Sequence, residues 1–240
     1  MSSHNKIDKF VYPFGKSKIC NLEKIVDSFL GPSSKEITVY NTTSGCLELS
    51  LSKKHKVKSI INNNHLYLNF WKCVVEDSVY FSEVLTNTFG NFDPADVTSF
   101  TKLAPNAIDK YAKSSFFYII KNCCVMNENG SYDLSGEFNA HETVQKIIAI
   151  KDLPPNNVTF YKEKPQDNKS DLFFYINYDD GLPTCLELCS MYDNWFLLTD
   201  PHKINPKYIK NEKILLLDEQ YLITKELEKC KKCLIFSTKT

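Results

Sequence analysis

The chain has 240 residues, 42% of them apolar and 24% charged, so we expect a globular protein and exclude a wholly disordered one. Its formal net charge is zero, with 29 basic and 29 acidic residues, and every basic residue is a lysine. The lack of arginine, together with only 7 glycines, excludes an arginine finger, a bidentate arginine–guanine contact and a glycine-rich phosphate loop.

The first third of the chain alternates helical and strand patterns. Apolar residues recur at helical spacing from Leu22 to Leu30, Asn21 is the expected N-cap, and Gly31 with Pro32 ends the helix. We expect further helices over residues 46–54 and 64–85, and strands over residues 37–40 and 55–62. Strand, turn and helix in repeated succession are typical of a parallel α/β sheet.

The middle of the chain, residues 87–152, has mostly helical patterns. It contains an apolar stretch over residues 116–120, a turn at residues 127–133 that indicates a small hairpin or loop, and a helix over residues 141–150. Strand patterns then return at residues 158–161, 172–176, 195–198, 214–217 and 233–236. Their short, continuous apolar runs suit strands buried on both faces. The sequence therefore predicts one α/β domain interrupted by a helical insertion.

Targeting and cysteine signals indicate an intracellular protein. No apolar run approaches 18 residues, and the first ten residues lack the apolar stretch of a secretory signal, so we expect no membrane span and no secretion. The nine cysteines are odd in number and stand mostly in apolar contexts, which predicts buried, reduced thiols. Cys230 and Cys233 form one C-x-x-C pair, but the spacing of Cys185 and Cys189 is too loose to complete a zinc site, so no metal is expected.

Four short segments carry the strongest functional signal. They are YPFGKSK (12–18), NTTSGCLELSL (41–51), IINNNHLYLNFW (60–71) and DLFFYINYDD (171–180). In this order and spacing they resemble the motifs of the Dam-type DNA adenine methyltransferases. The resemblance implies a Rossmann-like methyltransferase sheet formed by residues 1–86 and 153–240, with residues 87–152 as a helical, target-recognition-like insertion. It also implies S-adenosylmethionine as cofactor and an adenine amine as methyl acceptor.

The first two segments would contact the cofactor. Gly15 and Lys16 match the end of the family's Gly-Gly-Lys element. Ser44 and Gly45 fall in its Phe-x-Gly-x-Gly loop, where glycines let the backbone approach the cofactor closely. Only Gly45 matches that loop, because Thr43 replaces its first glycine.

The third segment would bind the cofactor ribose at the end of the second strand. Asn64 matches the family there, whereas the acid that accepts hydrogen bonds from the ribose is replaced by Asn62. An amide can still accept one such bond, but without the charge it forfeits part of a charge-assisted bond, which typically contributes about 1.5–3 kcal/mol.

The fourth segment stands where the family carries its catalytic Asp/Asn-Pro-Pro-Tyr/Phe motif. In the family, the first side chain and a proline carbonyl accept the protons of the adenine amine, and the aromatic residue stacks on the flipped base. Asn177 is an allowed first residue, but Tyr178 and Asp179 replace both prolines and Asp180 replaces the aromatic residue. Neither replacement fixes the backbone as proline does, so we interpret the motif as degenerate.

Charge is unevenly distributed along the chain. Residues 1–64 contain 10 lysines and 5 acids, whereas residues 65–152 contain 7 lysines and 11 acids. A net acidic insertion without arginine is poorly suited to neutralise phosphates, so weak or no nucleic-acid binding is expected. One basic cluster, at Lys53, Lys54 and neighbouring lysines, indicates either a solvated helix end or a modest nucleic-acid or partner surface.

Three functional hypotheses follow. The first is a catalytically degenerate methyltransferase-like protein that binds no cofactor and acts as a structural, scaffolding or partner-binding subunit, for example of a viral assembly. The alternative is an active adenine-specific methyltransferase with a divergent motif, which Lys16, Gly45, Asn177 and Tyr178 keep open. A third, weaker hypothesis is a subunit that binds nucleic acid or cofactor without chemistry and supports an active partner. Fold alone does not decide among them.

Overall fold

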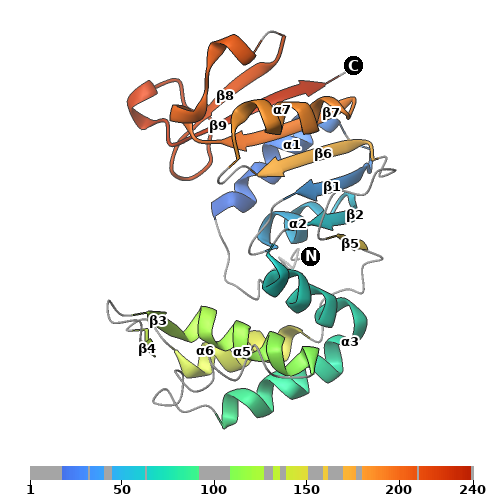
Figure 1. Ribbon diagram of the computed structural model, residues 1–240, viewed down its shortest axis with the longest axis vertical. Coiled ribbons are helices and arrows are strands. Elements are labelled where there is room, and N and C mark those ends of the chain that lie inside the picture. The colour runs from blue at the N-terminus through green and yellow to red at the C-terminus, as the bar shows by residue number, and fades with distance from the viewer. Residues whose placement is uncertain are drawn as a thin grey trace, which may run out of the picture.

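The computed structural model describes residues 18–31, 33–40, 45–62, 64–91, 109–126, 132–135, 139–150, 159–161, 170–176, 180–209 and 211–238. Its main feature is a seven-stranded sheet with the order β5-β2-β1-β6-β7-β9-β8 (Figure 1). The strands are β1 (Glu36–Tyr40), β2 (Lys56–Ile61), β5 (Thr159–Tyr161), β6 (Leu172–Ile176), β7 (Asn194–Thr199), β8 (Lys213–Leu217) and β9 (Lys232–Thr238). The first five are parallel, and β9 runs antiparallel to both β7 and β8. The mixed α/β architecture confirms the predicted fold class, and the largely parallel sheet is compatible with a Rossmann-like fold.

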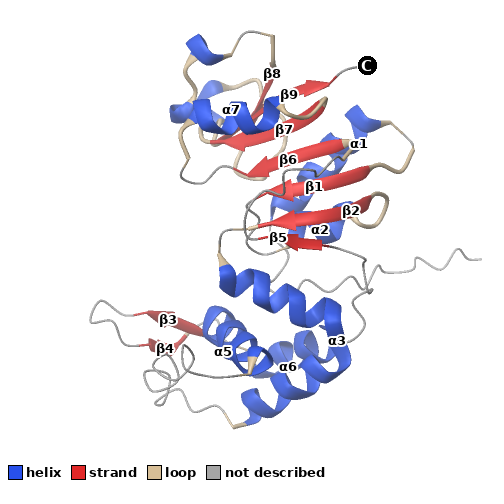
Figure 2. Ribbon diagram, turned by 45° about the vertical axis from the view of Figure 1, so that its right-hand side comes forward, coloured by secondary structure: helices blue, strands red, loops and turns tan. Residues whose placement is uncertain are grey.

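Helices cover both faces of this sheet (Figure 2). One face packs on α1 (Leu22–Leu30) and α2 (Cys46–Leu51), and the other on α7 (Leu182–Ser190). Strand β6 contributes to both layers, because Phe174 and Ile176 face α1 and α2 whereas Phe173 and Tyr175 face α7. All five of its residues are buried, which explains why the run is continuously apolar.

The chain around α1 departs from the prediction in one detail. Asn21 is not a side-chain N-cap, because it belongs to a preceding single-turn helix, η1 (Lys18–Asn21), and has helical dihedral angles. Its amide instead donates a 2.8 Å hydrogen bond to the carbonyl of Gln220, between β8 and β9. The side chain therefore ties η1 to the far end of the chain rather than starting α1.

The helical part contains α3 (His65–Gly90), α5 (Lys110–Cys123) and α6 (Ala140–Ile150), with a hairpin of β3 (Cys124–Met126) and β4 (Tyr132–Leu134). It has its own core, in which Phe70, Phe81, Tyr118 and Ile147 are buried together. Figure 2 shows this part below the sheet, connected to it through α3. Helix α3 runs past the boundary expected near residue 86, so one helix belongs to both parts.

A kink divides α3 near its middle. Asp77 has non-helical dihedral angles (φ −157°, ψ 85°), and its carboxylate accepts a 2.9 Å hydrogen bond from the backbone N–H of Tyr80. Asp77 thus caps a second helical segment in the way that aspartate caps helix N-termini. This kink directs the second half of α3 into the helical core.

Three further single-turn helices lie in the C-terminal part: η4 (Pro201–Lys203), η5 (Pro206–Tyr208) and η6 (Leu227–Lys229). Among the described residues, no helix has both the length and the apolar character needed to cross a membrane.

The cysteines differ from the expectation of nine reduced thiols. Cys20 in η1 and Cys46 in α2 form a disulfide, with their Cα atoms 5.9 Å apart. Sequence context predicted their burial but not their pairing, because the two residues become neighbours only when η1 packs on α2. The other seven cysteines are free thiols.

Candidate ligand site at the carboxyl edge of the sheet

The centre of the sheet contains a topological switch point. From β1 the chain continues to β2 on one side, and from the adjacent β6 it continues to β7 on the other. Open α/β sheets bind ligands outside the carboxyl ends of the strands at such a point. Tyr40 and Tyr175 pair there, and their rings stack with centroids 4.7 Å apart. This edge is therefore the candidate ligand site.

Four of the ten predicted site residues lie in described parts of the chain: Gly45, Asn62, Asn64 and Asp180. Gly45 follows β1, Asn62 and Asn64 follow β2, and Asp180 follows β6. The fold therefore brings the second, third and fourth sequence segments to one edge. The other six lie outside the described residues: Gly15, Lys16, Ser44, Asn177, Tyr178 and Asp179.

Gly45 forms a left-handed turn directly before α2. Its φ of +68° is accessible to glycine and costs other residues about 1–2 kcal/mol. A Cβ at this position would also overlap the indole ring of Trp71, which packs over the turn from α3. The glycine is thus required by the turn and by Trp71, two reasons that are independent of any cofactor.

Asn62 follows β2 and is only 2% exposed. Its Oδ1 accepts a 2.7 Å hydrogen bond from the backbone N–H of Asn64, which fixes the orientation of the amide. Asn64 in turn caps α3, because its own Oδ1 accepts the N–H of Leu66 at 3.0 Å. The oxygen of Asn62 therefore stabilises the turn that leads into α3. The Nδ2 of the same amide has no hydrogen-bond partner among the described residues. Where the family's acid accepts hydrogen bonds, this position presents a donor.

Asp180 is held in place by a buried tyrosine. The hydroxyl of Tyr175, at the end of β6, donates a hydrogen bond to Asp180 Oδ2. Burial, followed by this hydrogen bond and the proximity of Cys185, raises the pKa of Tyr175 far above its usual value, so the phenol stays protonated. Burial also raises the pKa of Cys185 to about 11, although the hydrogen bond with Tyr175 opposes the rise. The thiol is therefore protonated at neutral pH and is a poor nucleophile.

Tyr175 was not among the predicted site residues, although it lies in the fourth segment. The period-two alternation of β6 could have identified it, because this alternation places Phe173 and Tyr175 on one face and Tyr175 nearest the carboxyl end. Tyr40 was missed in the same way, since it ends the neighbouring strand.

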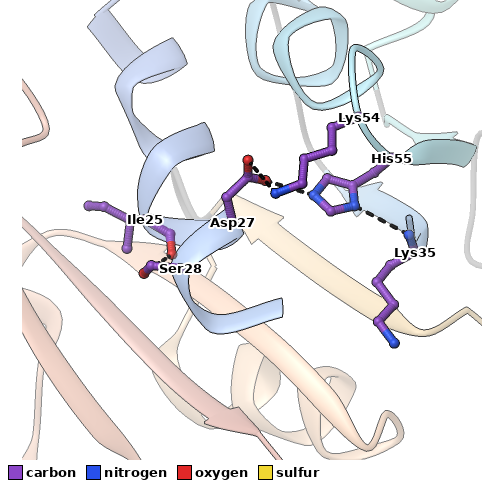
Figure 3. Close-up of polar contacts among 6 residues, drawn as sticks. All are labelled: Ile25, Asp27, Ser28, Lys35, Lys54 and His55. Atoms are coloured by element: carbon purple, nitrogen blue, oxygen red, sulfur yellow. Dashed lines mark hydrogen bonds and ion pairs between the residues drawn. The ribbon is translucent and has the colours of Figure 1, made fainter. Parts of the chain in front are cut away.

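A second polar cluster lies at the opposite edge of the sheet (Figure 3). The side chain of His55 is fully buried there, and its Nδ1 accepts the backbone N–H of Lys35 at 3.2 Å. Its Nε2 therefore carries the proton and donates to Asp27 Oδ1 at 2.7 Å. Both ring nitrogens are occupied, so His55 is a structural histidine that connects α1, β1 and β2.

Lysines complete this cluster. Lys54 pairs with Asp27 at 2.9 Å, while Lys56 and Lys58 both pair with Glu36. Burial raises the pKa of Asp27, but its hydrogen bonds with Lys54 and His55 outweigh this effect, so the pKa is below the ordinary value. Three lysines of the predicted basic cluster thus form ion pairs with two neighbouring acids, and they lie away from the carboxyl edge.

No group of three metal-ligating side chains occurs within the described parts of the chain. The sulfurs of Cys230 and Cys233 are 3.7 Å apart, and no further ligand joins them there. Cys185 and Cys189 are buried between α7 and the sheet.

Comparison with known proteins identifies no relative: no protein-family model matches the chain, and neither does any curated protein.

Proposed function

We propose that this protein is a catalytically degenerate relative of the Dam-type adenine methyltransferases, which acts as a partner-binding subunit rather than as an enzyme. The hydrogen bond between Tyr175 and Asp180 carries this proposal. Asp180 stands where the family has the aromatic residue that stacks on the flipped base. A carboxylate held by a buried tyrosine supplies no stacking face and brings negative charge toward nucleic acid.

The strand order supports the relationship to methyltransferases. Numbered along the chain, the seven strands have the order 3-2-1-4-5-7-6, whereas the dinucleotide-binding sheet has the parallel order 3-2-1-4-5-6. The difference is the reversed last strand, β9, inserted between β7 and β8. The first five strands therefore keep the order of a Rossmann-like sheet, as the resemblance implies. The helical insertion between β2 and β5 also falls where the resemblance places a target-recognition region.

The surface supports a protein partner more than a nucleic acid. Leu222, Ile223 and Leu227, between β8 and β9, expose 50%, 57% and 77% of their surface. Exposed apolar residues that form one patch are typical of surfaces that bind other proteins. In the insertion, Lys110 and Lys146 pair with acidic residues, which reduces the charge available to phosphates.

One observation favours the active alternative. The left-handed turn at Gly45 and the buried amide of Asn62 follow two adjacent strands, β1 and β2, at the edge where a cofactor would bind. An active enzyme would use them to hold S-adenosylmethionine. Its divergent motif would then have to work without both prolines.

A methyl-transfer assay separates the two functions. The chain is incubated with methyl-labelled S-adenosylmethionine and with duplex or single-stranded DNA rich in adenine, alongside the Asn177→Ala variant as matched control. We expect incorporation at the level of the blank for both proteins. Incorporation that the wild type shows and Asn177→Ala loses would overturn the degenerate assignment. Calorimetry with the cofactor then shows whether loss of transfer follows from loss of binding.

A further inference from the structure

The disulfide joins η1 to the start of α2, next to the Gly45 turn. Cys46 is the first residue of α2 and directly follows Gly45, while Cys20 lies in η1. Both residues are buried in the core formed with α1 and α2: Cys20 is 5% exposed and Cys46 is 1% exposed. The bond therefore fixes the start of the described chain to the turn that follows β1.

Besides the disulfide, η1 is held by packing in the core and by a hydrogen bond to the far end of the chain. It is a single turn of four residues, in which Ile19 joins the core and Asn21 binds the Gln220 carbonyl. Short elements of this kind open locally at a lower free-energy cost than central strands or long helices. Opening of η1 would expose both sulfurs without unfolding the sheet.

We propose that Cys20 and Cys46 form a reversible redox clasp, exchanged by small thiols and disulfides of the glutathione class. During closing, the thiolate of one cysteine attacks a glutathione disulfide, forms a mixed disulfide and releases one glutathione thiolate. The second cysteine, as thiolate, then attacks the sulfur of the first cysteine in the mixed disulfide and releases the second glutathione as a thiolate. The two protein thiols are oxidised, one glutathione disulfide is reduced to two thiols, and opening reverses both steps. The clasp goes beyond the proposed function and does not depend on it.

Folding and oxidation must reinforce each other at this site. A disulfide that spans 26 residues restricts the unfolded chain, so the bond favours the folded state. By linkage, the folded state favours the bond by the same factor. Cys230 and Cys233 provide an internal contrast, because their sulfurs lie 3.7 Å apart as free thiols. We expect the clasp to be the more strongly oxidised pair in the folded protein.

Thiol trapping tests whether the clasp forms. The chain is equilibrated in glutathione buffers of graded ratio, quenched with acid, alkylated in denaturant and analysed by peptide mass spectrometry. The Cys20–Cys46 bond should resist reduction in the folded protein up to a thiol-to-disulfide ratio about a hundred-fold more reducing than in urea. Equal midpoints in the folded and unfolded chains, or free Cys20 and Cys46 thiols throughout, would overturn the proposal.

Hydrogen exchange tests what the clasp controls. Reduction should speed amide exchange at least ten-fold in residues 18–22 and 45–50, and leave residues 233–236 of β9 unchanged. Cys20→Ser/Cys46→Ser should exchange like the reduced wild type under all conditions. The matched control, Cys230→Ser/Cys233→Ser, should keep the wild-type response to reduction. Identical exchange in oxidised and reduced wild type, which needs no variant to fold, would show that the bond restrains nothing.

Discussion

The two edges of the sheet differ in how completely their polar groups are satisfied. At the amino edge, His55 uses both ring nitrogens, and Asp27 accepts hydrogen bonds from His55 and Lys54. At the carboxyl edge, Gly45 has a positive φ, and Asn62 buries an amide nitrogen without a partner among the described residues. A buried polar group without a partner is more typical of a functional site, whereas a fully paired network mainly stabilises the fold. The amino edge is thus a paired structural network, and the carboxyl edge remains the candidate ligand site.

The largest expected effect tests the turn at the carboxyl edge. Gly45→Ala places a side chain in the left-handed region and drives its Cβ into the Trp71 ring. We expect a loss of about 3–4 kcal/mol in the free energy of unfolding, measured by urea denaturation. In the Trp71→Leu background, where the overlap is removed, Gly45→Ala should cost only the conformational term, about 1–2 kcal/mol relative to Trp71→Leu alone.

Gly90→Ala is the matched control for this prediction. Gly90 ends α3 without a positive φ, and an added Cβ would have no atom within 4 Å. Its substitution should change stability by less than about 1 kcal/mol. A loss at Gly90 equal to that at Gly45 would show that the Trp71 packing and the turn are not responsible.

A smaller effect tests the amino edge. His55→Ala removes a fully buried ring and leaves the Lys35 N–H and one Asp27 oxygen without their partner. We expect a loss of about 2–3 kcal/mol, because buried groups that lose a hydrogen-bond partner pay their desolvation cost. His65→Ala, at the exposed start of α3, should stay within about 0.5 kcal/mol of the wild type.

The same network predicts a dependence on acid. Folding lowers the pKa of Asp27, so its contribution to stability is fully present above the ordinary carboxyl pKa and is lost as pH falls through the lower folded value. Unfolding free energies measured between pH 6 and pH 2 should therefore fall less steeply in Asp27→Asn than in the wild type. Parallel pH profiles would contradict the assigned role of the carboxylate.

Most of the sheet could be predicted because its signals are local. Continuous apolar runs identified β6, β7, β8 and β9, and Asn64 was correctly expected to open α3. Helix α7 was missed, because nine residues beginning Leu-Pro-Thr give only a short and weak periodic pattern. The kink at Asp77 was missed too, because in the sequence an aspartate that caps a second helical segment cannot be distinguished from an aspartate on the surface of one continuous helix.

The candidate site was harder to predict because its contacts are long-range. The resemblance placed Gly45, Asn62 and Asp180 in one site, and the observed strand order brings them to one edge of the sheet. It could not show that Trp71 packs on Gly45 or that Tyr175 binds Asp180, because both contacts depend on how side chains from different elements meet. The disulfide could not be predicted for the same reason, because Cys20 and Cys46 belong to different elements. Local patterns thus predict elements and their edges, whereas partners across elements require the structure.

The smallest expected effect decides whether Asp180 is held as proposed. Tyr175→Phe keeps the ring that stacks on Tyr40 and removes only the hydroxyl that donates to Asp180, so we expect a loss of about 1 kcal/mol at pH 7. Folding raises the pKa of Tyr175, so its stabilisation is fully present below the ordinary phenol pKa of about 10 and declines above it. The difference between variant and wild type should therefore shrink above pH 10 in urea titrations. The control Tyr208→Phe, at a residue that is 49% exposed, should change stability at pH 7 by less than about 0.5 kcal/mol. A Tyr175→Phe protein as stable as the wild type at pH 7 would show that the Tyr175 hydroxyl does not hold Asp180, and would remove the observation on which the degenerate assignment rests.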